Sequence, residues 1–237
     1  MPRGQAEGAR RLRRMHAWLE RAYGPQHWWP AETAFEVVLG AFLTQNTSWK
    51  AVERSLANLR KAGALTVEGI RTRSLQELQE LVRPSGFYTR KAPALKSFVA
   101  MLDDEFEGSL EVLAATPTEA LRQRLLALPG VGLETADVIL LYALGHALPV
   151  ADEYLRRVVE RHELLEKTPG KDRKSYEALV ALTREAFAQD PVRKQTHLFG
   201  EFHALVVAVG KAHCARSADC AGCPLRRDPH QSDREPT

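Results

Sequence analysis

The sequence predicts an all-α fold. Apolar residues recur at helical spacing along most of the 237-residue chain, glycine and proline separate the helical stretches, and no convincing alternating strand appears. Residues 31–43 show the pattern well, with four apolar side chains on one face at i, i+3, i+4 and i+7 spacing: Phe35, Val38, Leu39 and Phe42. A content of 44% hydrophobic and 27% charged residues suits one large domain or two smaller ones.

The expected helices follow one another along the chain, and glycine or proline marks the ends of several. Gly63 ends the second, Pro84 follows the third, Pro117 opens the fifth and Gly145 ends the sixth. The stretches are residues 31–43, 48–63, 74–82, 90–102, 117–128, 133–145, 152–164, 175–187 and 196–213. An arginine-rich N-terminal stretch is expected to start one more helix, and the polar residues 226–237 are expected to be disordered.

Composition excludes several classes of protein. Lys and Arg number 33 against 30 Asp and Glu, a net charge of +3, so any anion binding must come from locally placed groups. The chain has no run of eighteen apolar residues, which predicts no membrane span. The arginines near the N-terminus precede no apolar core, so a secretory signal is excluded and a cytoplasmic protein is expected. They suit a solvated helix start better than a basic arm that contacts phosphates.

The stretch LPGVGLETAD, residues 128–137, predicts a helical hairpin. A proline followed by Gly130, Val131 and Gly132 joins two expected helices, and glycine leaves backbone N–H groups open where a side chain would cover them. Because the second helix starts at the same point, its positive end adds to these amides and favours an anion such as a DNA phosphate. For this stretch alone, an ordinary glycine-rich turn between helices is the alternative.

Asp152 opens the next expected helix, twenty residues after Gly132, and the combination resembles the helix-hairpin-helix DNA glycosylase superfamily. The resemblance implies that the hairpin grips a phosphate and that Asp152 faces a nucleotide turned out of double-stranded DNA. Cleavage of the N-glycosidic bond builds positive charge on the sugar, and a nearby carboxylate stabilises that charge and orients water. Asp152 is therefore the expected catalytic residue, and a plain helix N-cap is the other interpretation.

Glu134 stands where the superfamily members similar to endonuclease III carry a lysine, whose amine attacks the sugar and forms an imine. A carboxylate cannot form that imine. The resemblance therefore implies a monofunctional enzyme, which removes the base without lyase chemistry by this route. The alternative is that Glu134 is an exposed helix residue with no part in the reaction.

Four segments occur in the same order as in the 3-methyladenine DNA glycosylases related to endonuclease III, and the chain resembles that branch over residues 27–215: WWP, LTQNT, RPSGFY and LPGVGLETAD. The resemblance implies a pocket in which aromatic faces stack on a cationic alkylated purine. The expected pocket residues are Glu134, Trp28, Trp29, Trp49 and Lys211. Core packing is the alternative for the tryptophans, and a solvated helix end is the alternative for Lys211.

Two more residues are expected, by the same resemblance, to fill the gap that a flipped nucleotide leaves. Gln45 of LTQNT would hydrogen-bond the orphaned base, and Phe87 of SGFY would wedge between stacked bases. Each of the two could instead be an ordinary loop residue.

The three cysteines, Cys214, Cys220 and Cys223, lie close together near the C-terminus and do not look like a disulfide framework. Their spacing resembles the iron–sulfur loop of endonuclease III relatives, which has a fourth cysteine about six positions after the third. Pro229 holds that position here, beside His230. A structural [4Fe–4S] cluster is expected, with His230 or an outside group as the fourth ligand, and zinc or no metal are the alternatives.

The resemblance implies two helical lobes with a DNA-binding cleft between them. Residues 31–145 are expected to form a helical barrel that ends in the hairpin, and residues 1–30 with 146–237 are expected to form the lobe with the cysteine loop. The expected function is removal of alkylated purines, above all 3-methyladenine, by a nucleoid-associated monomer acting on double-stranded DNA. The alternatives are a glycosylase for oxidised pyrimidines or uracil, and a non-catalytic DNA-binding protein.

Overall fold

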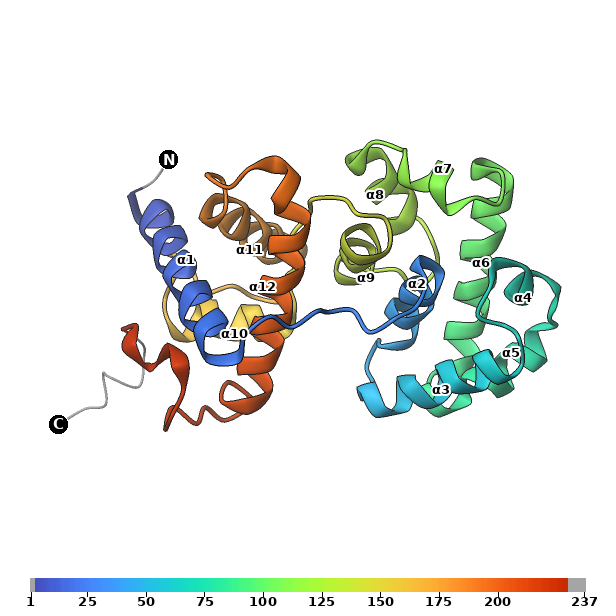
Figure 1. Cartoon of the computed structure of the whole chain (residues 1–237), viewed down its shortest axis with the longest axis horizontal. Coiled ribbons are helices and arrows are strands. Elements are labelled where there is room, and N and C mark those ends of the chain that lie inside the picture. Colours follow the sequence, from blue (N-terminus) through green and yellow to red (C-terminus); the bar gives the residue numbers. More distant parts are fainter. Residues whose placement is uncertain (1–2, 230–237) are drawn as a thin grey trace. The chain divides into compact units, whose positions relative to one another are not determined.

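The structure is a computed structural model that describes residues 3–229, with side chains from residue 6 onward (Figure 1). The chain forms two compact units. The first unit consists of the chain up to Trp28 together with the chain from Ala147 onward, and the second unit is Trp29–His146. In Figure 1 the first unit contains α1 and α10 to α12, and the second contains α2 to α9.

The second unit is built around α2 (Ala34–Leu43). Nine of its ten residues are buried, because α3, α6, α9 and the segment after α9 pack against it. Thr33 starts the helix by accepting a hydrogen bond from the Glu36 amide. The other elements of this unit are α3 (Trp49–Lys61), α4 (Val67–Thr72), α5 (Leu75–Val82), a 3₁₀ turn Arg83–Ser85, α6 (Tyr88–Phe106), α7 (Leu110–Ala114), α8 (Thr118–Leu126), α9 (Leu133–Val138) and a π-helical segment Ile139–Ala143.

The first unit has a core of four long or medium helices. Its elements are α1 (Arg3–Tyr23), α10 (Glu153–Arg161), α11 (Arg173–Ala186), α12 (Val192–Ala212) and a 3₁₀ turn Pro224–Arg227. α1 packs against α11 and α12, and α10 packs against α12. The fully buried Phe187 ring lies between these helices, with its centroid 5.2 Å from those of His16 and Phe202. Edge and tilted ring contacts of this kind add to the hydrophobic stabilisation of a core.

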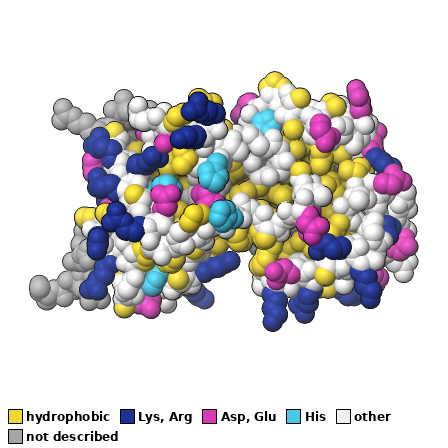
Figure 2. Space-filling view, viewed as in Figure 1, with side chains coloured by type: hydrophobic (Ala, Val, Ile, Leu, Met, Phe, Trp, Pro, Cys, Tyr) yellow, Lys and Arg dark blue, Asp and Glu magenta, His cyan; other side chains and the backbone are white. Residues whose placement is uncertain are grey.

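The N-terminal arginines are held by acidic residues within the first unit. Arg11 pairs with the buried Asp228 at 2.5 Å, and Arg13 pairs with Asp190 at 2.5 Å. These pairs favour the helical interpretation of the arginine-rich stretch over a basic arm. In the view of Figure 2, Lys and Arg side chains gather at the margin of the first unit where α1 and the C-terminal segment lie.

The predicted all-α fold is confirmed: the described residues contain no strand, only an isolated bridge between Cys214 and Ala218. Sequence periodicity does not reveal α4 and α7, because their six and five residues make less than two turns. The helix expected over residues 133–145 divides into α9 and the π-helical segment. Among the helices that the structure describes, none is both long and apolar enough to cross a membrane.

Candidate functional site

The glycine stretch forms the turn between α8 and α9. Gly130 has a φ of +77°, a left-handed conformation that favours glycine, and the Val131 amide donates to Leu128 O at 3.2 Å. Gly132 is extended (φ −97°, ψ 178°), and a Cβ at this position would meet no atom within 4 Å. The side chain of Val131 is buried, so this residue has only its backbone to offer a ligand. The turn therefore leaves the backbone beside Gly132 uncovered.

Gln45 connects the end of α2 to this turn. Its Nε2 donates to Gly130 O and to Thr135 Oγ1, both at 2.9 Å. Thr44 closes α2 through a hydrogen bond from its Oγ1 to Gly40 O at 2.6 Å. The LTQNT segment and the hairpin, separated by 85 residues in the sequence, are thus in direct contact within the second unit.

Phe87 lies at the start of α6 and is 57% exposed. Gly86 and Phe87 are both left-handed, with φ of +69° and +48°. A non-glycine residue in that region costs roughly 1–3 kcal/mol, and a ring on a residue that is more than half exposed regains little of it through burial. Strain and exposure together favour a contact with a partner over a role in packing.

The tryptophans expected in the base pocket divide between the two units. In the second unit, the Trp29 ring centroid lies 5.3 Å from that of Trp49, edge to face, and 5.7 Å from that of Tyr142. In the first unit, Lys211 Nζ lies 5.8 Å from the centroid of the Trp28 ring. The structure therefore brings Trp29 and Trp49 together and places Trp28 with Lys211.

Glu134 lies on the exposed first turn of α9. The helical run from Leu133 to Ala143 contains no lysine, so it offers no amine nucleophile. Tyr142, which the sequence patterns did not single out, lies near the end of the same run, in the π-helical segment. Single π-helical turns often accompany functional sites, and an irregular turn is a feature that sequence periodicity does not reveal.

Asp152 is the N-cap of α10. Its Oδ1 accepts a hydrogen bond from the Leu155 amide at 2.7 Å, and its Oδ2 lies 3.6 Å from His203 Nε2. Asp152 and His203 are only 8% and 7% exposed. Oδ1 is thus hydrogen-bonded and Oδ2 faces an imidazole within the first unit, in buried surroundings where charge interacts strongly. The sequence patterns did not single out His203, because one histidine inside the apolar run of α12 does not by itself indicate a functional site.

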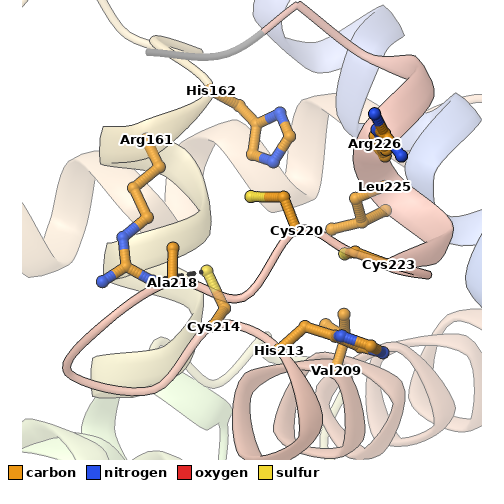
Figure 3. Close-up of a pocket in the computed structure, with 10 residues that line it drawn as sticks. All are labelled: Arg161, His162, Val209, His213, Cys214, Ala218, Cys220, Cys223, Leu225 and Arg226. Atoms are coloured by element: carbon orange, nitrogen blue, oxygen red, sulfur yellow. Dashed lines mark hydrogen bonds between the residues drawn. The ribbon is translucent and has the colours of Figure 1, made fainter. Parts of the chain in front are cut away.

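The three cysteines line one cavity of about 320 Å³ in the first unit. Figure 3 shows their sulfur atoms turned toward its interior, with Arg161 and His162 among the other lining residues. Arg161 Nη1 donates to Cys214 Sγ at 3.0 Å. Burial raises the pKa of the Cys223 thiol, and the neighbouring Cys214 and Cys220 raise it further.

The donor set of this cavity differs from that of a preformed site for one metal ion. Within the described part of the chain, no three His, Cys, Asp or Glu side chains are arranged to hold a single ion. His230, the expected fourth ligand, lies outside the described residues. The structure therefore brings the three thiols to one cavity.

Comparisons with known proteins agree on one family. The model of the HhH-GPD superfamily of base excision DNA repair proteins matches residues 39–184. A protein of Methanocaldococcus jannaschii that is named as a DNA repair glycosylase is 40% identical over 206 residues, which cover 86% of this chain and 89% of that protein.

Two solved structures are also similar to this chain. The 3-methyladenine DNA glycosylase of H. pylori, bound to 1,N6-ethenoadenine, is similar with a TM-score of 0.70 and 28% identity, over 87% of this chain and 98% of that chain. A trapped covalent intermediate of endonuclease III with DNA is similar with a TM-score of 0.71, over 92% of this chain and 93% of that chain. Its identity is 23%, so this second likeness concerns the fold alone.

Proposed function

Because the chain belongs to the HhH-GPD superfamily of base excision DNA repair proteins and is a DNA glycosylase, we propose that it releases alkylated purines, above all 3-methyladenine, and leaves the DNA strand uncut. The observation that carries this proposal is the aromatic cluster of Trp29, Trp49 and Tyr142, in the unit whose helix α9 carries Glu134. The likeness to the 3-methyladenine DNA glycosylase of H. pylori supports the same substrate class.

The aromatic cluster suits the chemistry of this substrate. A purine alkylated at N3 is cationic and electron-poor, so it stacks favourably on indole and phenol rings. The exposed carboxylate of Glu134 would offset the charge of such a base or accept a hydrogen bond from its exocyclic amine. Trp28 and Lys211, which lie against each other in the first unit, are that unit's candidates for contact with the base.

We assign the chemical step to Asp152. As the N-glycosidic bond breaks, positive charge develops on the sugar, and a buried carboxylate that is already oriented stabilises this charge. The Leu155 amide fixes Oδ1 and His203 lies beside Oδ2, so the carboxylate does not need DNA to adopt its position. The same group then orients water for attack on the sugar.

The hairpin and the two neighbouring loops are assigned to DNA contacts. Backbone N–H groups left uncovered around Gly130 and Gly132 bind a phosphate without reading sequence. The exposed Phe87 is the wedge between stacked bases, and Gln45 is the partner of the orphaned base. Gln45 must give up its hydrogen bonds to Gly130 and Thr135 to reach that base, so filling the gap also alters the hairpin.

The strand stays uncut because α9 provides no amine for an imine with the sugar. The position that would need a lysine holds Glu134. We further propose that the protein works as a monomer on double-stranded DNA in the cytoplasm, associated with the nucleoid. That the two units are separate domains, with DNA in a cleft between them, stays a prediction.

We assign the cysteine cavity to a structural [4Fe–4S] cluster held by Cys214, Cys220 and Cys223, with His230 or an outside group as the fourth ligand. Three thiols that line one cavity, with the spacing of the iron–sulfur loop that the sequence resembles, favour a cluster over zinc. Bound there, the cluster would brace the loop and take no part in base removal. Anaerobically purified protein is expected to be brown with about four irons per chain. Cys220→Ser should lose the iron, and zinc or an iron-free protein would contradict the assignment.

Identification of the released bases tests the proposed substrate. DNA methylated with dimethyl sulfate is incubated with the purified protein, and mass spectrometry identifies the bases in the soluble fraction. We expect 3-methyladenine as the main product, released roughly 10²-fold more slowly by Asp152→Asn. Release of uracil or of oxidised pyrimidines from suitably damaged DNA, without release of 3-methyladenine, would favour the alternative glycosylase function.

A further inference from the structure

A buried lysine joins the two loops that carry Gln45 and Phe87. Lys91, in the first turn of α6, is 4% exposed, and its Nζ donates to Leu43 O at 2.8 Å and to Ser85 O at 2.7 Å. Leu43 ends α2 two residues before Gln45, and Ser85 ends the 3₁₀ turn two residues before Phe87. One ammonium group therefore hydrogen-bonds to the chain at the start of both loops.

Packing alone does not account for a lysine at this place. Burial lowers the pKa of Lys91 from 10.5 to about 8, because the ammonium loses its water. An apolar side chain would fill the same space without that cost. What the ammonium adds is a charged donor for two carbonyls. Leu43 O is one of the last carbonyls of α2. These carbonyls have no partner within the helix and lie at the negative end of its dipole.

Two further hydrogen bonds fix the position of Ser85. The Ser85 amide donates to Ser55 Oγ at 3.0 Å, and Ser85 Oγ donates to Val82 O at 2.8 Å, with both serines fully buried. Ser55 lies on α3, so the short turn is fixed between α3 and α6. Gly86 and Phe87 follow at once in left-handed conformations. The strained Phe87 thus projects from a turn that is held from two sides.

We infer that Lys91 is a positioning residue for insertion into DNA: its ammonium fixes the separation of Gln45 and Phe87, so that both enter the duplex together when a nucleotide turns out. The inference rests on the proposed roles of Gln45 and Phe87. Groups that must act together lose a large factor in rate when one is displaced by about 1 Å. Lys91 acts only through the carbonyls of Leu43 and Ser85 and touches neither base nor sugar.

The test measures insertion itself, whatever base the enzyme prefers. A duplex carries a stable abasic analogue beside the fluorescent base 2-aminopurine, and an inserted side chain unstacks that base and raises its fluorescence. We expect Lys91→Met to slow this rise about tenfold and to change the Kd for the same duplex less than about threefold, because the hairpin contact is intact. Phe87→Ala should abolish most of the rise.

Lys96→Met is the matched control. Lys96 lies on the same helix, and its Nζ donates to one carbonyl, Arg71 O at 2.9 Å, away from both loops. We expect this variant to insert at the wild-type rate. The inference is wrong if Lys91→Met also inserts at the wild-type rate, or if it is slowed no more than Lys96→Met.

Thermal melts show whether Lys91→Met folds. If it does not, Lys91→Gln takes its place, because its shorter neutral side chain keeps a donor and reaches only one carbonyl. Slow insertion by a folded Lys91→Gln variant would support the inference, and wild-type insertion would overturn it. If the wild-type protein gives no fluorescence rise at saturating binding, the proposed insertion of Phe87 and Gln45 is wrong. If the wild type and the Lys91 variants all give a normal rise, only the role of Lys91 is wrong.

Discussion

The carboxylate Oδ2 of Asp152 lies 3.6 Å from Nε2 of His203, with both side chains buried in the first unit. The other oxygen accepts a hydrogen bond from the Leu155 amide at 2.7 Å. The group that we assign to charge stabilisation is therefore oriented before DNA binds, which is the condition under which a fixed charge lowers a reaction barrier most effectively. The carboxylate that we propose as catalytic is also the N-cap of α10, so the two interpretations of Asp152 do not exclude each other.

Asp152→Asn separates these two roles. Asparagine caps a helix as well as aspartate does, so the melting temperature is expected to change little. Removal of the charge should slow base release by roughly 10²-fold or more while DNA affinity is kept. Single-turnover release and a binding titration measure both quantities. Near-wild-type turnover would show that Asp152 serves only as a helix cap.

His203→Gln tests whether the imidazole acts through Asp152. Glutamine keeps a donor but loses the ring, and we expect base release to slow about tenfold because the carboxylate is less firmly held. The double variant with Asp152→Asn should be no slower than Asp152→Asn alone, since residues that act as one unit are not additive. Additive losses in the double variant would mean that His203 contributes elsewhere.

The two glycines of the hairpin are expected to respond differently to alanine. Gly130 is left-handed at φ +77°, so Gly130→Ala should destabilise the fold by about 1–2 kcal/mol. Gly132 is extended with open space around it, so Gly132→Ala should leave the melting temperature nearly unchanged. Its methyl group should still weaken binding to every duplex, because it covers a backbone contact to phosphate. Weakened binding to one DNA sequence only would argue against a backbone contact to phosphate.

The burial of Lys91 predicts a pH dependence of stability. Its pKa is about 8 in the folded chain against an ordinary value of 10.5, so between these values the unfolded chain binds more protons and the free energy of unfolding rises with pH. Below about pH 8 the cost of the buried charge is present in full. Urea denaturation should therefore show that the free energy of unfolding of the wild type, relative to that of Lys91→Met, increases as pH rises. A difference that is constant with pH would contradict the burial of a charged lysine.

The long helices and the hairpin could be predicted from the sequence, because apolar periodicity and glycine placement are local signals. The short helices α4 and α7 carry too few turns for such a signal. The sequence does not reveal His203 and Lys91 for another reason: the roles that we propose for them depend on contacts with Asp152, Leu43 and Ser85, which tertiary packing creates. The local spacing of the cysteines indicated a shared site, whereas Arg161 beside Cys214 comes from a separate helix and only the structure reveals it.

We propose that this glycosylase removes an alkylated purine and leaves the strand intact, because α9 carries Glu134 where an amine would be needed. A gel of an end-labelled duplex methylated with dimethyl sulfate tests it most directly. After incubation with the protein, half of each sample receives mild alkali, which cuts abasic sites, and a parallel sample receives borohydride. We expect new bands at adenine positions only after alkali, and no protein–DNA complex trapped by borohydride. Bands without alkali, or a trapped complex, would show that another amine attacks the sugar and would contradict the claim.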